Sequence, residues 1–151
     1  MVQLPFLIFA DMKQAECRED DVSIEGMRIL LAEDNELNME IAEFLLTNAG
    51  AEIIRASNGK EAVEASAKSG VDEINVILMD IMMPVMDGLE ATREIRTMNR
   101  SDASAVVIIA MTANAFAEDK SKALKAGMDE YLTKPLESEK LIRALSRYKY
   151  N

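Results

Sequence analysis

The chain has 151 residues, 49% of them hydrophobic, which is enough for one domain with a full-sized core and too few for two. Its 17 basic and 27 acidic residues give a formal net charge of −10, which argues against non-specific binding to nucleic acids. With no histidine and one cysteine, the chain excludes zinc, haem and iron–sulfur centres, histidine-dependent catalytic triads and an internal disulfide.

The first 26 residues differ in pattern from the rest, and we expect them to form an N-terminal extension. An apolar stretch at residues 2–9 precedes an acidic one at residues 11–26 that is typical of a linker. The apolar stretch lacks the basic start and cleavage site of a signal peptide, and no apolar run reaches the ~20 residues of a membrane span. We therefore expect a cytoplasmic domain at residues 27–151 that makes no membrane contact.

From Met27 onward, short apolar runs alternate with amphipathic helices. Strands are expected to begin near residues 28, 52, 75, 105 and 129. The first helix carries four apolar side chains on one face: Leu37, Ile41, Phe44 and Leu45. Later helices are expected at about residues 58–69, 88–98, 117–126 and 138–150. Five such units in a row predict a doubly wound α/β fold with a five-stranded parallel sheet and right-handed crossovers.

Polar side chains stand where four of these strands end. Glu33 and Asp34 follow the first strand, and Asp80 ends the third. Thr112 follows the fourth strand, and Lys134 follows the fifth. Because parallel strands share one carboxyl edge, we expect these five groups to converge there.

Three clustered carboxylates have a chemical consequence. Two unit charges ~4 Å apart interact by about 4 kcal/mol at an effective dielectric near 20, so the cluster must bind a cation or hold a proton. Hard oxygen ligands fit Mg²⁺ better than a transition metal. With Lys134 and Thr112 contacting phosphoryl oxygens, the carboxylate of Asp80 would be the nucleophile and would form an acyl phosphate.

Each of these signals is weak by itself. The acidic pair Glu33–Asp34 and Thr112 are also typical helix caps, and a lysine such as Lys134 is usually a solvated surface residue. Asp80 is harder to explain in this way, because Asp87 is the better cap for the next helix. Four compatible groups at four strand ends favour a common site over coincidence.

Four segments give the chain a resemblance to the response-regulator receiver domain: Leu31–Asn35, Met79–Gly88, Ala110–Ala113 and Leu132–Pro135. The resemblance covers Met27 to about Tyr150 and implies a single (βα)5 flavodoxin-like domain. It implies Asp80 as the phospho-acceptor. It further implies that Asp34, Asp80 and the backbone carbonyl of Met82 ligate Mg²⁺, while Glu33 acts largely through water.

The resemblance also implies roles around the phosphoryl group. Thr112 and Lys134 would contact that group, and the ring of Tyr131 would follow Thr112 as a switch. The Lys134–Pro135 bond would be cis. Met82 and Asn114 would flank the path of a hydrolytic water. An apolar Met82 cannot orient that water, whereas a carboxamide at either position could. We therefore expect intermediate to slow self-dephosphorylation.

The segments around Met82–Pro84 and Met111–Ala115 resemble receivers fused to hybrid sensor histidine kinases. This implies a phosphohistidine on a kinase dimerisation domain as the donor and a histidine phosphotransfer protein as a further partner. Docking would use the apolar side of the first helix near Asn38 and Met39. Phosphorylation would shift the face of the fourth helix, fifth strand and fifth helix. The domain itself would catalyse only its own phosphorylation and dephosphorylation, whereas a longer parent chain would be a histidine kinase.

Other interpretations remain open at this point. Residues 2–9 resemble the last strand of a kinase ATP-binding domain, but they are also compatible with a tag or a disordered tail. A haloacid-dehalogenase-type phosphatase would carry an acid where Met82 stands. A receiver-like binding module without phosphoryl chemistry would have lost Asp80, Lys134 or one of the acidic pair. A transcription factor would need a DNA-binding domain, and the chain has no pattern for one.

Overall fold

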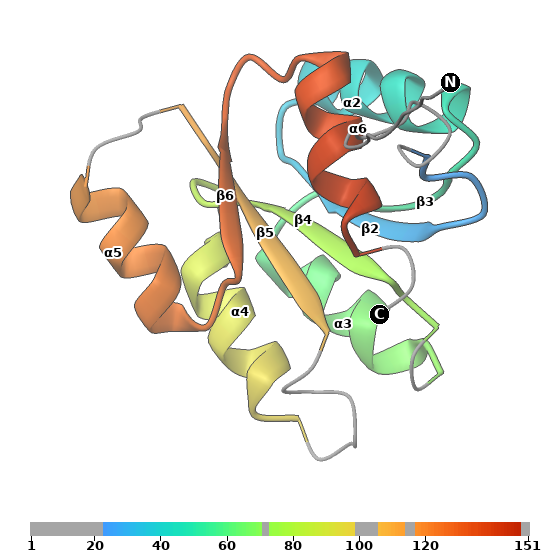
Figure 1. Cartoon of the computed structure of the whole chain (residues 1–151). Helices are drawn as coiled ribbons and strands as arrows, with labels where there is room; N and C mark the ends of the chain where they lie inside the picture. Colours follow the sequence, from blue (N-terminus) through green and yellow to red (C-terminus); the bar gives the residue numbers. More distant parts are fainter. Residues whose placement is uncertain (1–22, 71–72, 99–105, 114–116, 149–151) are drawn as a thin grey trace, which may run out of the picture.

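Five parallel strands form the sheet, and predicted site residues stand at its carboxyl edge. The computed structural model describes residues 23–70, 73–98, 106–113 and 117–148. The strands are β2 (Arg28–Ala32), β3 (Glu52–Ala56), β4 (Val76–Asp80), β5 (Val107–Thr112) and β6 (Glu130–Thr133). They lie in the order β3-β2-β4-β5-β6 (Figure 1). This confirms the predicted five-stranded parallel sheet.

Helices cover both faces of the sheet. They are α2 (Glu36–Asn48), α3 (Gly59–Lys68), α4 (Gly88–Arg96), α5 (Ala117–Ala126) and α6 (Ser138–Ser146). Helices α2 and α6 lie on one face and α3, α4 and α5 on the other (Figure 1). Helix α6 is shorter than predicted, because it ends at Ser146 rather than near Tyr150. In the described part of the chain, no helix has the length and apolarity that crossing a membrane requires.

Successive side chains of each strand point to opposite faces of the sheet, so the strands contribute to two hydrophobic cores, one on each face. In β2, Ile29 and Leu31 pack toward α2 and α6, while Leu30 packs toward α3 and α4, and all three are fully buried. Ile24 is also fully buried in the first core. The packed structure therefore includes at least one residue of the stretch that we expected to be linker.

Helix α2 turns a different side to the sheet than its large apolar residues predict. Leu37, Ile41 and Phe44 are 65%, 47% and 67% exposed. The side that faces the sheet carries three other apolar residues: Met39, Ala42 and Leu46. The expectation that Met39 contributes to an exposed docking surface is therefore wrong, because this side chain is 4% exposed.

The order of the strands fixes where a site can form. Strands β3 and β4 lie on opposite sides of β2, so the connections leaving β2 and β4 run to different sides and open a crevice between them. Open α/β sheets bind ligands in the crevice at the carboxyl ends of such strands. Glu33 and Asp80 stand at the carboxyl ends of β2 and β4.

Candidate functional site

Three carboxylates meet between the ends of β2 and β4. Oxygens of Glu33, Asp34 and Asp80 lie within 4.8 Å of one another. Glu33 and Asp80 are buried, whereas Asp34 is exposed. The backbone N–H of Glu33 donates to the carbonyl of Ala56 over 3.0 Å, which continues the pairing of β2 with β3 and holds the acidic pair at the sheet edge. The predicted convergence of these residues is present.

Lys134 reaches the same cluster from the end of β6. Its Nζ lies 2.7 Å from Oε2 of Glu33 and 3.1 Å from Oδ2 of Asp80. Its backbone N–H donates to the carbonyl of Thr112 over 2.8 Å, so the β5–β6 pairing sets where the side chain begins. Thr112 itself is 8% exposed at the end of β5.

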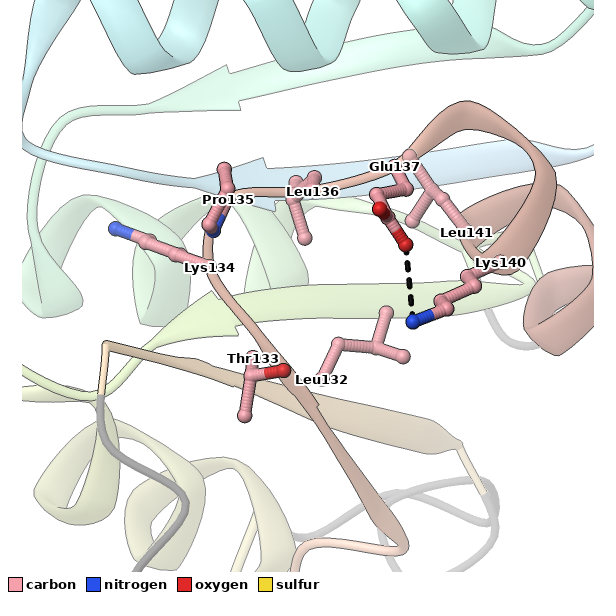
Figure 2. A pocket seen from close by; sticks show the side chains of 8 residues that line it. All are labelled: Leu132, Thr133, Lys134, Pro135, Leu136, Glu137, Lys140 and Leu141. Carbon is pink, nitrogen blue, oxygen red and sulfur yellow. Dashed lines mark ion pairs between the residues drawn. The ribbon is translucent and has the colours of Figure 1, made fainter.

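The connection after β6 separates Lys134 from the start of α6. The Lys134–Pro135 peptide bond is cis. In Figure 2, Lys134 extends away from the ion pair between Glu137 and Lys140. These residues line a cavity of about 220 Å³ beneath the connection. The side chain of Lys134 contacts the carboxylates of Glu33 and Asp80 and points away from the neighbouring charges of α6.

The loop after Asp80 is tied tightly to the sheet. The backbone N–H of Met82 donates to Oδ1 of Asp80 over 3.3 Å, and that of Ile81 donates to the carbonyl of Met111 over 3.2 Å. Gly88 lies so close that a Cβ there would overlap the carbonyl oxygen of Asp80. In the sequence, Gly88 indicates only the start of a helix, although a glycine at that point can signal close backbone approach.

Charge and burial shift the pKa values of Asp80, Glu33 and Lys134 in different directions. Burial raises the pKa of Asp80 to about 7, and a hydrogen bond and the charge of Glu33 add to this, while Lys134 opposes it. Burial also acts to raise the pKa of Glu33, but its hydrogen bonds, first with Lys134, leave that pKa below its usual value. Burial alone would lower the pKa of Lys134, yet both carboxylates together raise it.

The donor set fits a hard divalent cation. Lys134 offers one positive charge to two buried carboxylates, and Asp34 adds a third carboxylate at the exposed side. Oxygen-only ligation with room for water is what Mg²⁺ prefers. An open hollow of about 370 Å³ adjoins the cluster at Asp34, and Met82, Met83, Pro84 and Asp87 complete its lining.

The remaining predicted residues surround this centre or lie outside the described residues. Tyr131 in β6 is partly buried, and Nζ of Lys120 lies 4.6 Å from the centre of its ring. This contact had no signal in the sequence, because it joins α5 to β6. Met82 is 79% exposed. Asn114 lies outside the residues that the structure describes.

A small groove links the site to the exposed side of α2. It holds about 90 Å³ between the helix and the connection after β6. Ile41, Ala42, Pro135 and Leu136 give it apolar walls, and Glu33, Asn38 and Lys134 complete the lining. The carboxylate cluster and the exposed apolar residues of α2 are therefore parts of one continuous surface.

Comparison with known proteins identifies the family. The model of the response regulator receiver domain matches residues 29–146. The chain is 40% identical over 121 residues to hybrid signal transduction histidine kinase I of Dictyostelium discoideum, and 36% identical over 128 residues to the sensor protein GacS of Pseudomonas syringae pv. syringae. These matches cover 79% and 84% of this chain but only 7% and 14% of the relatives. The chain belongs to the response regulator receiver domain family, which serves two-component signal transduction.

Solved structures agree with this assignment. The receiver domain of the sensor histidine kinase PA1611 from Pseudomonas aeruginosa PAO1 superposes with a TM-score of 0.75 and 39% identity, over 83% of this chain and 99% of that one. That structure has a magnesium ion coordinated in its active site cleft. The receiver domain of Saccharomyces cerevisiae Ssk1, solved with the histidine phosphotransfer protein Ypd1, gives a TM-score of 0.73 at 30% identity, over 83% and 90% of the two chains. The predicted family and fold are confirmed.

Proposed function

We propose that Asp80 is the phospho-acceptor of this receiver and that it takes a phosphoryl group from a phosphohistidine of a histidine kinase. The observation that carries the proposal is the convergence of Glu33, Asp34 and Asp80 with Lys134 at one sheet edge. Asp34, Asp80 and the backbone carbonyl of Met82 would hold Mg²⁺, and Glu33 would act largely through water. When bound, Mg²⁺ supplies charge neutralisation for the phosphoryl oxygens.

The chain's own residues account for the transfer. A carboxylate oxygen of Asp80 attacks phosphorus, the bond from phosphorus to the imidazole nitrogen breaks, and the imidazole keeps the electron pair. Lys134 already contacts Oδ2 of Asp80, so its ammonium lies within reach of a group added to that carboxylate. Thr112 ends the adjacent strand and donates its hydroxyl to a phosphoryl oxygen.

The same site supports switching and a long-lived product. A hydrogen bond from Thr112 to the phosphoryl group moves the end of β5 toward Asp80, and the ring of Tyr131 on β6 changes its orientation with Thr112. Met82 and Asn114 tune the lifetime of the acyl phosphate, because the apolar side chain of Met82 cannot orient a hydrolytic water, whereas the carboxamide of Asn114 can.

The partners follow from the exposed surface beside the site. The stripe of Leu37, Ile41 and Phe44 on α2, with the groove next to it, suits the apolar face of a helical phosphotransfer or kinase dimerisation domain. The similar Ssk1 receiver was solved with a phosphotransfer protein. We propose that the domain lies in the cytoplasm, where ATP-dependent kinases operate, and that it is the receiver part of a hybrid sensor histidine kinase.

Intact-protein mass spectrometry tests the proposal. After incubation with acetyl phosphate and Mg²⁺, the wild type should gain one phosphoryl group, and it should gain none without Mg²⁺. Asp80→Asn should gain none. Asp87→Asn is the matched control, because asparagine still caps α4 as Asp87 does, and it should be phosphorylated normally. No addition under any condition would leave the domain a phosphorylation-independent binding module.

A further inference from the structure

Methionine side chains in this protein differ widely in their exposure. Six of the described methionines are at most 9% exposed: Met27, Met39, Met79, Met83, Met111 and Met128. Met86 and Met98 are partly buried, and Met82 is 79% exposed. A two-electron oxidant in solution therefore reaches the sulfur of Met82 with the least hindrance among the described methionines.

Met82 is also held beside the reacting carboxylate. Its backbone N–H donates to Oδ1 of Asp80 over 3.3 Å. Met82 also lines the same open hollow as Asp34 of the carboxylate cluster. A chemical change at this residue therefore takes place at the solvent-facing edge of the site.

Oxidation would convert the apolar side chain of Met82 into a polar one. The sulfur lone pair attacks one oxygen of hydrogen peroxide and the O–O bond breaks. The proton on the oxygen now bound to sulfur passes to the departing hydroxide, which leaves as water. The sulfur is oxidised to a sulfoxide and the peroxide is reduced. A thioether is a weak hydrogen-bond acceptor, whereas the sulfoxide oxygen accepts strongly.

We propose that Met82 is an oxidation site through which a peroxide shortens the lifetime of the acyl phosphate on Asp80. The sulfoxide oxygen accepts a hydrogen bond from water at the solvent-facing edge of the site and orients that water toward the phosphoryl group. The consequence for lifetime rests on the proposed function, whereas the assignment of the oxidation site does not. Methionine sulfoxide reductase would reverse the change.

The first experiment locates the oxidation and needs no Mg²⁺ and no phosphorylation. The full chain is treated with limiting hydrogen peroxide, and peptide mapping follows the added oxygen at each methionine. Met82 should be oxidised before each of the six buried methionines, and in Met82→Leu the peptide from this loop should gain no oxygen at that stage. Equal or earlier oxidation of a buried methionine would overturn the assignment.

The second experiment measures the consequence. Protein phosphorylated with acetyl phosphate and Mg²⁺ is freed of the donor, and the loss of the phosphoryl group is followed by mass. Peroxide treatment should shorten the half-life by about threefold to tenfold, the size expected from one extra hydrogen bond, and the reductase should restore it. In Met82→Leu, peroxide should leave that variant's own half-life unchanged.

The outcomes separate the two proposals. An unchanged half-life in protein that carries sulfoxide at Met82 would overturn the further inference alone. A similar shortening in Met82→Leu would assign the effect to another residue and would also overturn it. A protein that accepts no phosphoryl group before or after oxidation would overturn the proposed function and, with it, the effect on lifetime.

Discussion

Asp80 has an unusual balance of charges. Lys134 contacts its carboxylate and that of Glu33, so one ammonium is shared by two buried acids. Burial and Glu33 together raise the pKa of Asp80 to about 7. A nucleophilic carboxylate has to be ionised, and a nearby cation favours that form. The cation that the cluster attracts therefore also prepares Asp80 for reaction.

Replacing Asp80 should change how stability depends on pH in Mg²⁺-free solution. Its pKa is about 7 when folded, against a usual 3.8. Between these values the folded state holds more protons than the unfolded one, so this group makes stability fall as the pH rises from about 4 to about 7. We expect Asp80→Asn to be more stable than the wild type by about 2 kcal/mol near pH 8, and by little near pH 4.

Urea unfolding in the presence of a chelator measures this difference. The lowered pKa of Glu33 acts with the opposite sign, since it contributes stability above its unfolded pKa and loses it as the pH falls, but Glu33 is present in both proteins. A stability difference that is the same at both pH values would contradict the explanation by titration of Asp80.

At this scale, the sequence predicts which residues meet but not how each is held. Glu33, Asp80 and Lys134 could be identified because each follows an apolar run and parallel strands share one edge. The left-handed backbone at Val85, with φ of 70°, had no signal, because a β-branched residue rarely adopts that conformation. The exposure of Met82 was equally hidden, since it depends on the path of the loop.

Among the elements, the start of α4 sets the position of Asp80 through Gly88. A Cβ at Gly88 would overlap the carbonyl oxygen of Asp80 and lie 2.9 Å from Cγ of Met79, so either the helix or the strand would have to shift. We expect Gly88→Ala to cost about 2 kcal/mol of stability, even though alanine favours helix. It should also slow phosphorylation by acetyl phosphate.

Gly70→Ala is the matched control for this change. The nearest atom to a Cβ at Gly70 is Oε1 of Glu73 at 3.5 Å, which is ordinary contact. The free energy of unfolding, measured with urea, should therefore stay within about 0.5 kcal/mol of the wild type. Equal effects of the two substitutions would contradict the idea that close packing of α4 on β4 is responsible.

Helix α2 shows that a sequence pattern can predict a helix without predicting which side of it faces the sheet. Two neighbouring stripes of the helix carry apolar residues at helical spacing, one with Leu37 and Phe44 and one with Met39 and Leu46. Periodicity detects both but cannot rank them. The smaller stripe, which includes Ala42, faces the sheet, and the larger one is left at the surface beside the site.

For the molecule as a whole, Ile24 is the first of the described residues that is buried in a core. It is fully buried in the first core, and the neighbouring Gly26 donates to the carbonyl of Gly50 over 2.9 Å. We expect a chain of residues 27–151 to be less stable than one of residues 23–151 by about 3 kcal/mol, the usual cost of losing a large buried side chain. Thermal or urea unfolding of the two chains measures this, and equal stability would show that Ile24 adds nothing.

The exposed stripe of α2 relates the whole molecule to its partners. Phe44 is 67% exposed, so Phe44→Ser should leave stability and phosphorylation by acetyl phosphate, which needs no docking, unchanged. Transfer from a phosphorylated histidine phosphotransfer protein should slow by about tenfold, because aromatic side chains often dominate interfaces.

Leu124→Ser is the control, since Leu124 is 61% exposed on α5, at the opposite face of the sheet. This variant should accept the phosphoryl group at the wild-type rate. Equal slowing in both variants would place docking elsewhere. Slowing in Phe44→Ser alone would mean that the side of α2 left out of the core is the side that partners use.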